Sequence, residues 1–188
     1  MDPLFASSIF VLGLVFGSFL NVCIYRLPLG LSVVTPRSAC PHCKRLIAFY
    51  DNMPVISWLL LQGRCRHCKA RISARYLFIE LLTGALFLGC YAYFGLTLAT
   101  LKYCVFGFLL LGLIFTDAET KLLPDKLTLP GLFLGIVFSL LVPVNDVASQ
   151  FLPGIMNLPF STDFSTHLLS LVDSLLGAAL GTSFIYGA

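Results

Sequence analysis

The sequence predicts an all-α polytopic membrane protein with about five transmembrane helices and a small polar module between the first and the second. Hydrophobic residues make up 58% of the 188 residues and charged residues 11%, whereas soluble domains carry about 25% charged residues. The mean hydropathy is +0.93. Nine of the twelve lysines and arginines lie between Arg26 and Arg75, where Asp51 is the single acid. The charge is thus gathered in one segment outside the membrane.

Residues 1–26 are predicted to form the first transmembrane helix. The uncharged run from Pro3 to Tyr25 is long enough for the roughly 20 residues that a bilayer requires. A cleaved secretory signal is disfavoured, because its start would be basic and here Asp2 is acidic. The predicted spans cover about 4–25, 76–95, 97–116, 127–144 and 168–188.

The basic module, about 27–75, is predicted to lie in the cytoplasm because cytoplasmic loops carry an excess of Lys and Arg. The N-terminus then lies outside. Because successive spans cross the membrane in alternating directions, the segment after the third span returns to the cytoplasmic side. The basic residues Lys121 and Lys126 in this segment agree with a cytoplasmic placement. Segment 145–167 contains acids but no Lys or Arg, which suits an outside loop. The resulting division is a first helix at 1–26, the module at 27–75 and a further transmembrane region at 76–188.

The module contains two C-x2-C pairs, CPHC at 40–43 and CRHC at 65–68, with 21 residues between them. Each pair directs two sulfurs to one point, so two pairs complete the tetrahedron of a structural zinc site. Four thiolates leave no open position on the metal, which is therefore expected to organise the module and not to catalyse hydrolysis. Disulfides are the competing interpretation, and the cytoplasm disfavours them. The predicted ligands are Cys40, Cys43, Cys65 and Cys68.

The histidines of the module and the three cysteines outside it are not expected to bind the metal. His42 and His67 lie inside the two pairs and could replace a thiolate, but we expect ordinary turn residues. The remaining cysteines lie in the predicted spans and are expected to be small apolar packing residues, namely Cys23, Cys90 and Cys104.

The window FTDAETKLLPD at 115–125 holds three of the nine acids between two apolar stretches. Acids at a membrane edge are candidates for function, and aspartyl proteolysis is one such chemistry. It needs two neighbouring carboxylates that share a proton. The window supplies one good acid, Asp117, and no compelling partner: Glu119 would diverge from it on a helix, and Pro124 would break the helix before Asp125. The alternative is that all three acids are solvated turn residues paired with lysines 121 and 126.

Several segments occur together in an order that is typical of one family. They are GSFLNVCIYRLP at 17–28, the two cysteine pairs, YDNMPVISWLLLQGRCRHC at 50–68, ARYLFIELLTGALF at 74–87, FTDAETKLLPDKLTLPG at 115–131 and, more weakly, DSLLGAALG at 173–181. In combination they resemble the type IV prepilin peptidases.

The resemblance implies an aspartyl protease of the bacterial inner membrane. Such an enzyme cuts short basic leaders from prepilins and pseudopilins of type IV pili or type II secretion systems, at the cytoplasmic face. Many members then methylate the new N-terminus with S-adenosylmethionine, although no binding motif for that cofactor is legible here. The implied partners are these substrates and membrane lipids, and no nucleic acid.

The resemblance makes Asp117, followed by Leu123 and Pro124, the first catalytic aspartate, and gives no catalytic role to Asp125 or Glu119. The family's second aspartate lies in a G-x-G-D motif, which these 188 residues do not contain. We therefore expect the chain to be a fragment that lacks peptidase activity, taken from an active protein.

Four further polar residues and one tryptophan could have either a functional or a structural role. Ser18 and Asn21 are expected to form interhelical hydrogen bonds, although the resemblance hints at a place near the site. Glu80 follows Arg75 by five residues, and we expect an interface ion pair there, not a contact with a substrate amine. Asp173 is expected to anchor the last span. The stretch around Trp58 is expected to pack the module on the membrane surface.

Two other functions remain open from the residues. One is a non-catalytic, zinc-stapled membrane module that docks partners in a pilus or type II secretion machine. The other is a membrane thiol redox protein, which predicts reversible disulfides in the C-x2-C pairs and no bound zinc.

Overall fold

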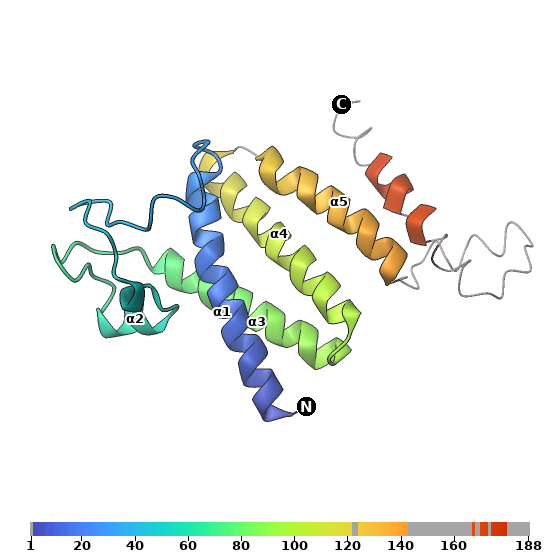
Figure 1. Cartoon of the computed structure of the whole chain (residues 1–188), viewed down its shortest axis with the longest axis horizontal. Coiled ribbons are helices and arrows are strands. Elements are labelled where there is room, and N and C mark those ends of the chain that lie inside the picture. Colours follow the sequence, from blue (N-terminus) through green and yellow to red (C-terminus); the bar gives the residue numbers. More distant parts are fainter. Residues whose placement is uncertain (1, 122–123, 143–166, 168–169, 173, 180–188) are drawn as a thin grey trace, which may run out of the picture. The chain divides into compact units, whose positions relative to one another are not determined.

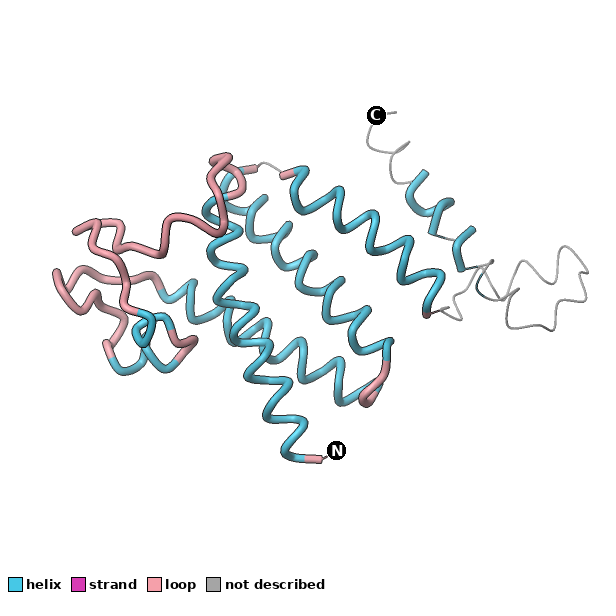
Figure 2. The backbone as a smooth tube through the Cα atoms, viewed as in Figure 1, coloured by secondary structure: helices cyan, strands magenta, loops and turns pink. Residues whose placement is uncertain are grey.

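The structure is a computed structural model that describes residues 2–121, 124–142, 167, 170–172 and 174–179 (Figure 1). It divides into two compact units, Met1–Thr128 and Leu129–Ala188. The elements in order are the helix α1 (Pro3–Arg26), the short 3-10 helix η1 (Phe49–Asn52) and the helices α2 (Ile56–Leu60), α3 (Ala74–Phe94), α4 (Leu98–Thr120) and α5 (Asp125–Leu141). Figure 2 shows helices and loops without a strand in the described residues, as the all-α prediction requires.

Three described helices, α1, α3 and α4, are long and apolar enough to cross a membrane. They correspond to the first three predicted spans. The fourth predicted span corresponds to α5, a shorter helix of 17 residues. The fifth, 168–188, is described only at 170–172 and 174–179, and the predicted outside loop and Asp173 lie outside the described residues except for residue 167. The structure thus supports a membrane protein, with three candidate spans in the described part of the chain, and the count of five stays a prediction.

Helices α1 and α3 make the most extensive contact between described elements, and two glycines four residues apart allow it. A Cβ placed on Gly13 would lie 2.7 Å from the Cα of Gly84, and a Cβ on Gly17 would lie 2.7 Å from the Cα of Glu80. The two backbones therefore touch, as they do where small residues recur every fourth position in membrane helices.

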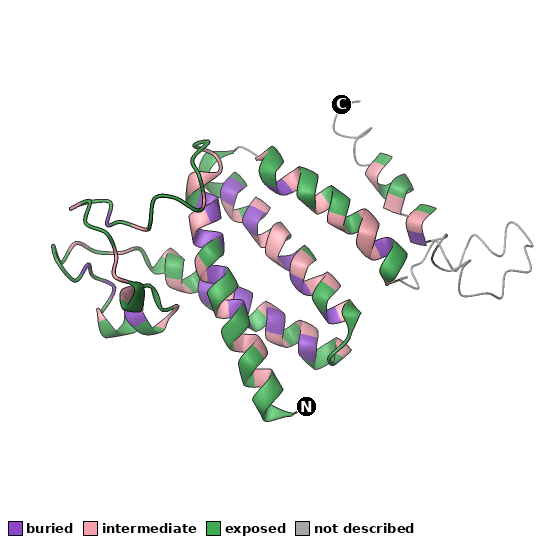
Figure 3. Ribbon diagram, viewed as in Figure 1, coloured by how far each residue is buried: buried purple, intermediate pink, exposed green. Residues whose placement is uncertain are grey.

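Helix α4 completes the bundle of the first unit by packing against both other spans. Leu20, Ile24 and Ile79 are fully buried, and α4 covers them with three partly buried side chains, Phe108, Leu111 and Phe115. Figure 3 shows buried residues along these helices and mostly exposed residues in the loop module. Many large apolar side chains of the spans stay exposed, as expected where lipid is the surrounding medium.

The end of α1, the start of α3 and the end of α4 lie together. Asn21 Nδ2 donates to the Tyr76 carbonyl at 3.1 Å, which joins α1 to the first turn of α3. The Arg75 guanidinium forms an ion pair with the Glu119 carboxylate, which joins α3 to the last turn of α4. The module and the acidic window therefore share one side of the bundle, as alternating spans predict. The compartment that this side faces stays a prediction.

Helix α4 continues to Thr120, four residues past the predicted end of the third span at 116. Asp117 is thus helical and does not lie in a turn. Ala118 and Glu119 are good helix formers, so the helix continues until Lys121, whose φ of 53° and N–H bond to the Asp117 carbonyl close it. The prediction of a broken helix before Asp125 is confirmed, since α5 starts there.

Candidate functional site

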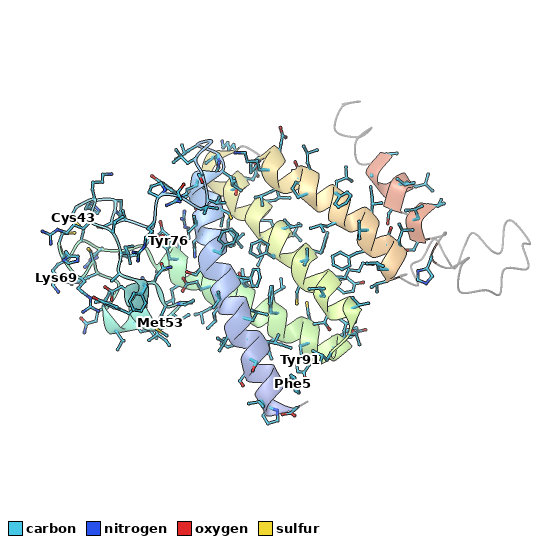
Figure 4. The ribbon with its side chains drawn as sticks, viewed as in Figure 1. Phe5, Cys43, Met53, Lys69, Tyr76 and Tyr91 are labelled. Atoms are coloured by element: carbon cyan, nitrogen blue, oxygen red, sulfur yellow. The ribbon has the colours of Figure 1, made fainter. Side chains whose placement is uncertain are left out.

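The two C-x2-C pairs fold into the same local turn. In each, the lysine that follows the second cysteine donates its N–H to the carbonyl of the first cysteine, at 2.9 Å in one turn and 3.0 Å in the other. These lysines, Lys44 and Lys69, both have a φ of 58°, which is in the left-handed region. An isolated antiparallel bridge closes each turn, Ala39 with Leu46 and Arg64 with Arg71. Figure 4 shows Cys43 and Lys69 on the module, away from the helices.

The four predicted cysteines come together at one point. Their Sγ atoms all lie within 4.8 Å of one another, and Cys40 Sγ lies 3.7 Å from Cys68 Sγ across the two turns. A tetrahedron with Zn–S distances of about 2.3 Å has sulfur–sulfur edges of about 3.8 Å. The cluster could therefore hold a metal ion and its geometry fits zinc. No histidine belongs to this group in the described residues, and the His67 ring instead contacts Arg45 at 3.3 Å.

The backbone of the second turn favours the thiolate form at Cys65, whereas Cys68, despite a hydrogen bond from the Ala70 N–H, has its pKa raised to about 11 by burial and the neighbouring thiols. Hydrogen bonds from the N–H groups of Cys68 and His67 lower the pKa of the Cys65 thiol to about 6. The thiolate is the form that binds metals, so Cys65 is ready to act as a ligand near neutral pH.

The single acid of the module has a structural partner. Asp51 accepts two hydrogen bonds from the Arg66 guanidinium, at 2.6 and 2.7 Å, and this pairing lowers the pKa of the Asp51 carboxyl. The paired, fork-like geometry is the strong form of such a contact. Because Asp51 lies on η1 and Arg66 lies between the cysteines of the second pair, the contact holds η1 to the cysteine cluster.

The three acids of the window have different surroundings. Asp117 is exposed on the last turn of α4, and its carboxylate has no side-chain partner in the part of the chain that the structure describes. Glu119 is held by Arg75. Asp125 lies in the first turn of α5, where a negative charge suits the helix dipole. The alternative pairing with the two lysines is not found among the described residues, and the structure does not bring a second carboxylate to Asp117.

The predicted ion pair at Glu80 is wrong. Its Oε2 atom accepts a hydrogen bond from the backbone N–H of Val55 at 2.7 Å, and Ser18 lies beside the same carboxylate. Residues five apart on a helix do not face each other, so Arg75 points elsewhere and pairs with Glu119. Glu80 is 8% exposed and connects the membrane bundle to the module.

The Val55 backbone is strained where it meets Glu80. Its φ is 61° and its ψ is −54°, and the N–H of Ile56 donates to the carbonyl of Pro54 at 2.5 Å. This is a tight γ-turn with positive φ, which is rare, and for a β-branched residue it is a true outlier. Nothing in the local sequence predicts it, since glycine would be the expected residue at such a position.

The structure also shows the surroundings of Asn21, of the cysteines in the spans and of Trp58. Asn21 forms the predicted interhelical hydrogen bond, and its Oδ1 is buried without a partner in the described residues. Among the cysteines of the spans, Cys23 and Cys104 are buried, as packing residues should be, and Cys90 is half-buried. The ring of Trp58 covers Gly63, and no contact tests its predicted place on the membrane surface.

Sequence reasoning missed the contact surface between α1 and α3, although a signal for it exists. Gly13 and Gly17 form a G-x-x-x-G pattern within the first span, which is typical of close helix pairs in membranes. That pattern predicts a closely packed face on the first span, and the structure shows that Glu80 lies opposite Gly17 on that face.

Comparison with known proteins covers almost the whole chain. The family described as "Bacterial Peptidase A24 N-terminal domain" matches residues 11–94, and the family described as "Type IV leader peptidase family" matches residues 104–187. No solved structure matches the chain.

Curated relatives carry the name "Prepilin leader peptidase/N-methyltransferase". One from Myxococcus xanthus is 49% identical over 73% of this chain and 41% of its own length. One from Aeromonas hydrophila is 40% identical over 73% of this chain and 56% of its own length. The chain thus spans about half the length of these two relatives. One from Klebsiella pneumoniae is 40% identical over 95% of this chain and 84% of its own length. With this identity over most of both sequences, the chain belongs to the type IV prepilin leader peptidase family.

Proposed function

We propose that this chain is part of an aspartyl peptidase of the bacterial inner membrane. It removes basic leader peptides from type IV prepilins or pseudopilins at the cytoplasmic face. Asp117 supplies one catalytic carboxylate. The second belongs to the G-x-G-D motif of the family, which these 188 residues do not contain. Family membership and the names of the relatives support the substrate class.

The observation that carries the proposal is the difference between Asp117 and its neighbour Glu119. Glu119 is fixed in an ion pair with Arg75 and has a structural role. Asp117, two residues earlier, is exposed at the end of a predicted span, and its carboxylate makes no contact with another side chain in the described residues. A carboxylate at a membrane edge without a structural partner is the kind of group that can meet both water and a peptide.

The chemistry follows from two carboxyl groups that share one proton. The ionised group takes a proton from water as the water oxygen attacks the scissile carbonyl carbon. The protonated group donates a hydrogen bond to the carbonyl oxygen and stabilises the charge that develops there. Breakdown of the tetrahedral intermediate breaks the C–N bond, and the leaving amine takes the proton that the first carboxylate had accepted from water. Asp117 contributes one of these two groups.

We also propose that the intact protein methylates the new N-terminus, because the relatives are named for both activities. The methyl donor would be S-adenosylmethionine, which would supply an electrophilic methyl group to the new amine. The cysteine module would serve either activity structurally, because a metal held by four thiolates is closed to substrate.

The proposal is tested with the natural full-length protein and a prepilin substrate in membranes. Asp117→Asn should reduce leader removal by at least about a thousandfold, as expected when one member of a catalytic carboxylate pair is lost. Glu119→Gln is the matched control and should retain most of the activity while lowering stability. Normal processing by Asp117→Asn would overturn the proposal and favour a non-catalytic docking module.

A further inference from the structure

A pocket of about 300 Å³ lies where the last turns of α1 meet the first loops of the module. Val22 and Arg26 of α1 form one wall, and the other is formed by loop residues that include Val34 and Arg37, together with Phe49 of η1. The pocket is distinct from the cysteine cluster and from Asp117, since neither contributes to its lining.

The polar part of this pocket is cationic. Arg26 donates to the carbonyl of Ser32 at 2.9 Å, and Arg37 donates to the carbonyl of Ile47 at 3.5 Å. The first bond orients Arg26, the second is a long and weak contact of an exposed side chain, and neither neutralises its guanidinium group. No acid lines the pocket, and neither arginine has an ion pair among the described residues. Two guanidinium groups that no acid neutralises are suited to a phosphate, which accepts their paired donors.

The rest of the lining is mainly apolar, with Ser38 and Asn52 as its other polar residues. Val34 and Phe49 are each 79% exposed and are therefore accessible to an apolar ligand. Both side chains line the same pocket as Arg26 and Arg37. An amphiphile with an anionic head and an apolar body would satisfy both parts of the lining, whereas a free anion would leave the apolar part in water.

The place of Arg26 and Val22 along α1 indicates how deep the pocket lies relative to the membrane. Arg26 is the last residue of this membrane-spanning helix, and Val22 lies one turn earlier inside the span. Arginine at a helix end places its charge at the level of the lipid headgroups. Basic pockets at this level in membrane proteins bind anionic headgroups.

We propose that this pocket binds one anionic phospholipid. Arg26 and Arg37 contact its phosphate, and Val34 and Phe49 lie against the glycerol and the upper part of its acyl chains. The bound lipid fastens the first loops of the module to the membrane surface. This proposal does not depend on peptidase activity.

The test is native mass spectrometry of the full-length protein in a neutral detergent, titrated with phosphatidylglycerol. We expect one tightly retained lipid per chain. The double variant Arg26→Gln/Arg37→Gln should weaken its binding roughly 25-fold, because each basic residue near a lipid surface contributes about fivefold. Phe49→Ser should weaken the binding of phosphatidylglycerol without a change in charge, and phosphatidylcholine should bind more weakly than phosphatidylglycerol.

The matched control is Arg71→Gln, an exposed arginine of the same module that does not line the pocket. It should leave lipid binding unchanged. An equal loss in Arg71→Gln, or no loss in the double variant, would overturn the proposal by showing a diffuse basic surface or no site. Displacement of the lipid by millimolar inorganic phosphate would overturn it in favour of a free-phosphate site. Unfolding temperatures measured without phosphatidylglycerol should agree between all variants, which separates lost binding from lost folding.

Discussion

Glu80 is a buried carboxylate in a membrane-spanning helix, and its partner is the backbone of a loop. Its Oε2 holds the N–H of Val55 at 2.7 Å, at a residue whose φ of 61° is unfavourable for valine. Strained conformations persist only where the surroundings compensate them. We infer that Glu80 fixes this turn and thereby sets the position of η1 and α2 against the bundle.

Replacing Glu80 should loosen the module before it affects the bundle. Glu80→Ala leaves the Val55 N–H without its acceptor, which should lower the free energy of unfolding by about 1–3 kcal/mol. Glu80→Gln keeps an acceptor oxygen and should lose less. The measurement is unfolding in mixed detergent together with limited proteolysis of residues 49–62. Equal protection of this segment in the wild type and in Glu80→Ala would contradict the role of the contact.

The ion pair between Arg75 and Glu119 gives a second prediction at this scale. Both side chains are partly exposed, at 27% and 29%, so the coupling between them should be modest, about 0.5–1 kcal/mol. A double-mutant cycle with Arg75→Gln and Glu119→Gln measures it. A coupling energy of zero between Arg75 and Glu119 would show that this ion pair does not join α3 to α4.

Asp117→Asn, by contrast, should leave the free energy of unfolding unchanged, because the Asp117 carboxylate has no side-chain partner in the described residues.

At the scale of elements, the contact between α1 and α3 depends on the absence of side chains. Gly17 meets the backbone of α3 at Glu80, and a Cβ there would lie 2.7 Å from a Cα atom, which neither helix can avoid without moving. Gly89 of α3 is also helical, but a Cβ there would meet nothing within 4 Å. The two glycines therefore form a matched pair for the same substitution.

Alanine favours a helix over glycine by about 1 kcal/mol, so helix propensity alone predicts that both substitutions stabilise. We expect Gly89→Ala to be neutral or stabilising. Gly17→Ala should destabilise by about 1–3 kcal/mol, because overpacking forces the helices apart. Unfolding of both variants in the same detergent measures the difference. Equal stability of the two variants would show that the backbones of α1 and α3 do not touch in the folded protein.

At the scale of the whole molecule, the first unit combines a helical bundle with a loop module that has little core of its own. The helices contact one another directly, whereas the module holds two turns whose four sulfurs lie within 4.8 Å of one another. A metal bound there would contribute folding energy to the module, and the bundle would not depend on it.

Metal analysis of the purified protein should find one zinc per chain. Cys40→Ser/Cys68→Ser should abolish it and expose residues 27–73 to protease, while the helical circular dichroism of the spans remains. Cys90→Ser, a half-buried cysteine of α3, is the control and should keep the metal. A protein that contains no metal when purified under reducing conditions, or a Cys40→Ser/Cys68→Ser variant with an intact module, would contradict the structural role.

The sequence by itself determined the membrane class, three of the spans, the cysteine set and Asp117 as the acid to test. Each of these is a local signal: a long apolar run, a pair of cysteines two residues apart, or an acid at the end of an apolar run. The helix break before Asp125 followed from Pro124 in the same way. Local signals survive folding because they depend on the chain's own backbone and on the bilayer thickness.

Only the tertiary structure decided which charges meet. The sequence predicted an ion pair at Glu80, but Arg75 reached Glu119 on another helix, 44 positions along the chain, and Glu80 took a backbone partner from the module. Hydropathy fixes that a helix spans the membrane, but not how it rotates about its axis. That rotation is set by close packing, here at Gly13 and Gly17, and it determines that Glu80 faces α1 and the module while Arg75 faces the end of α4.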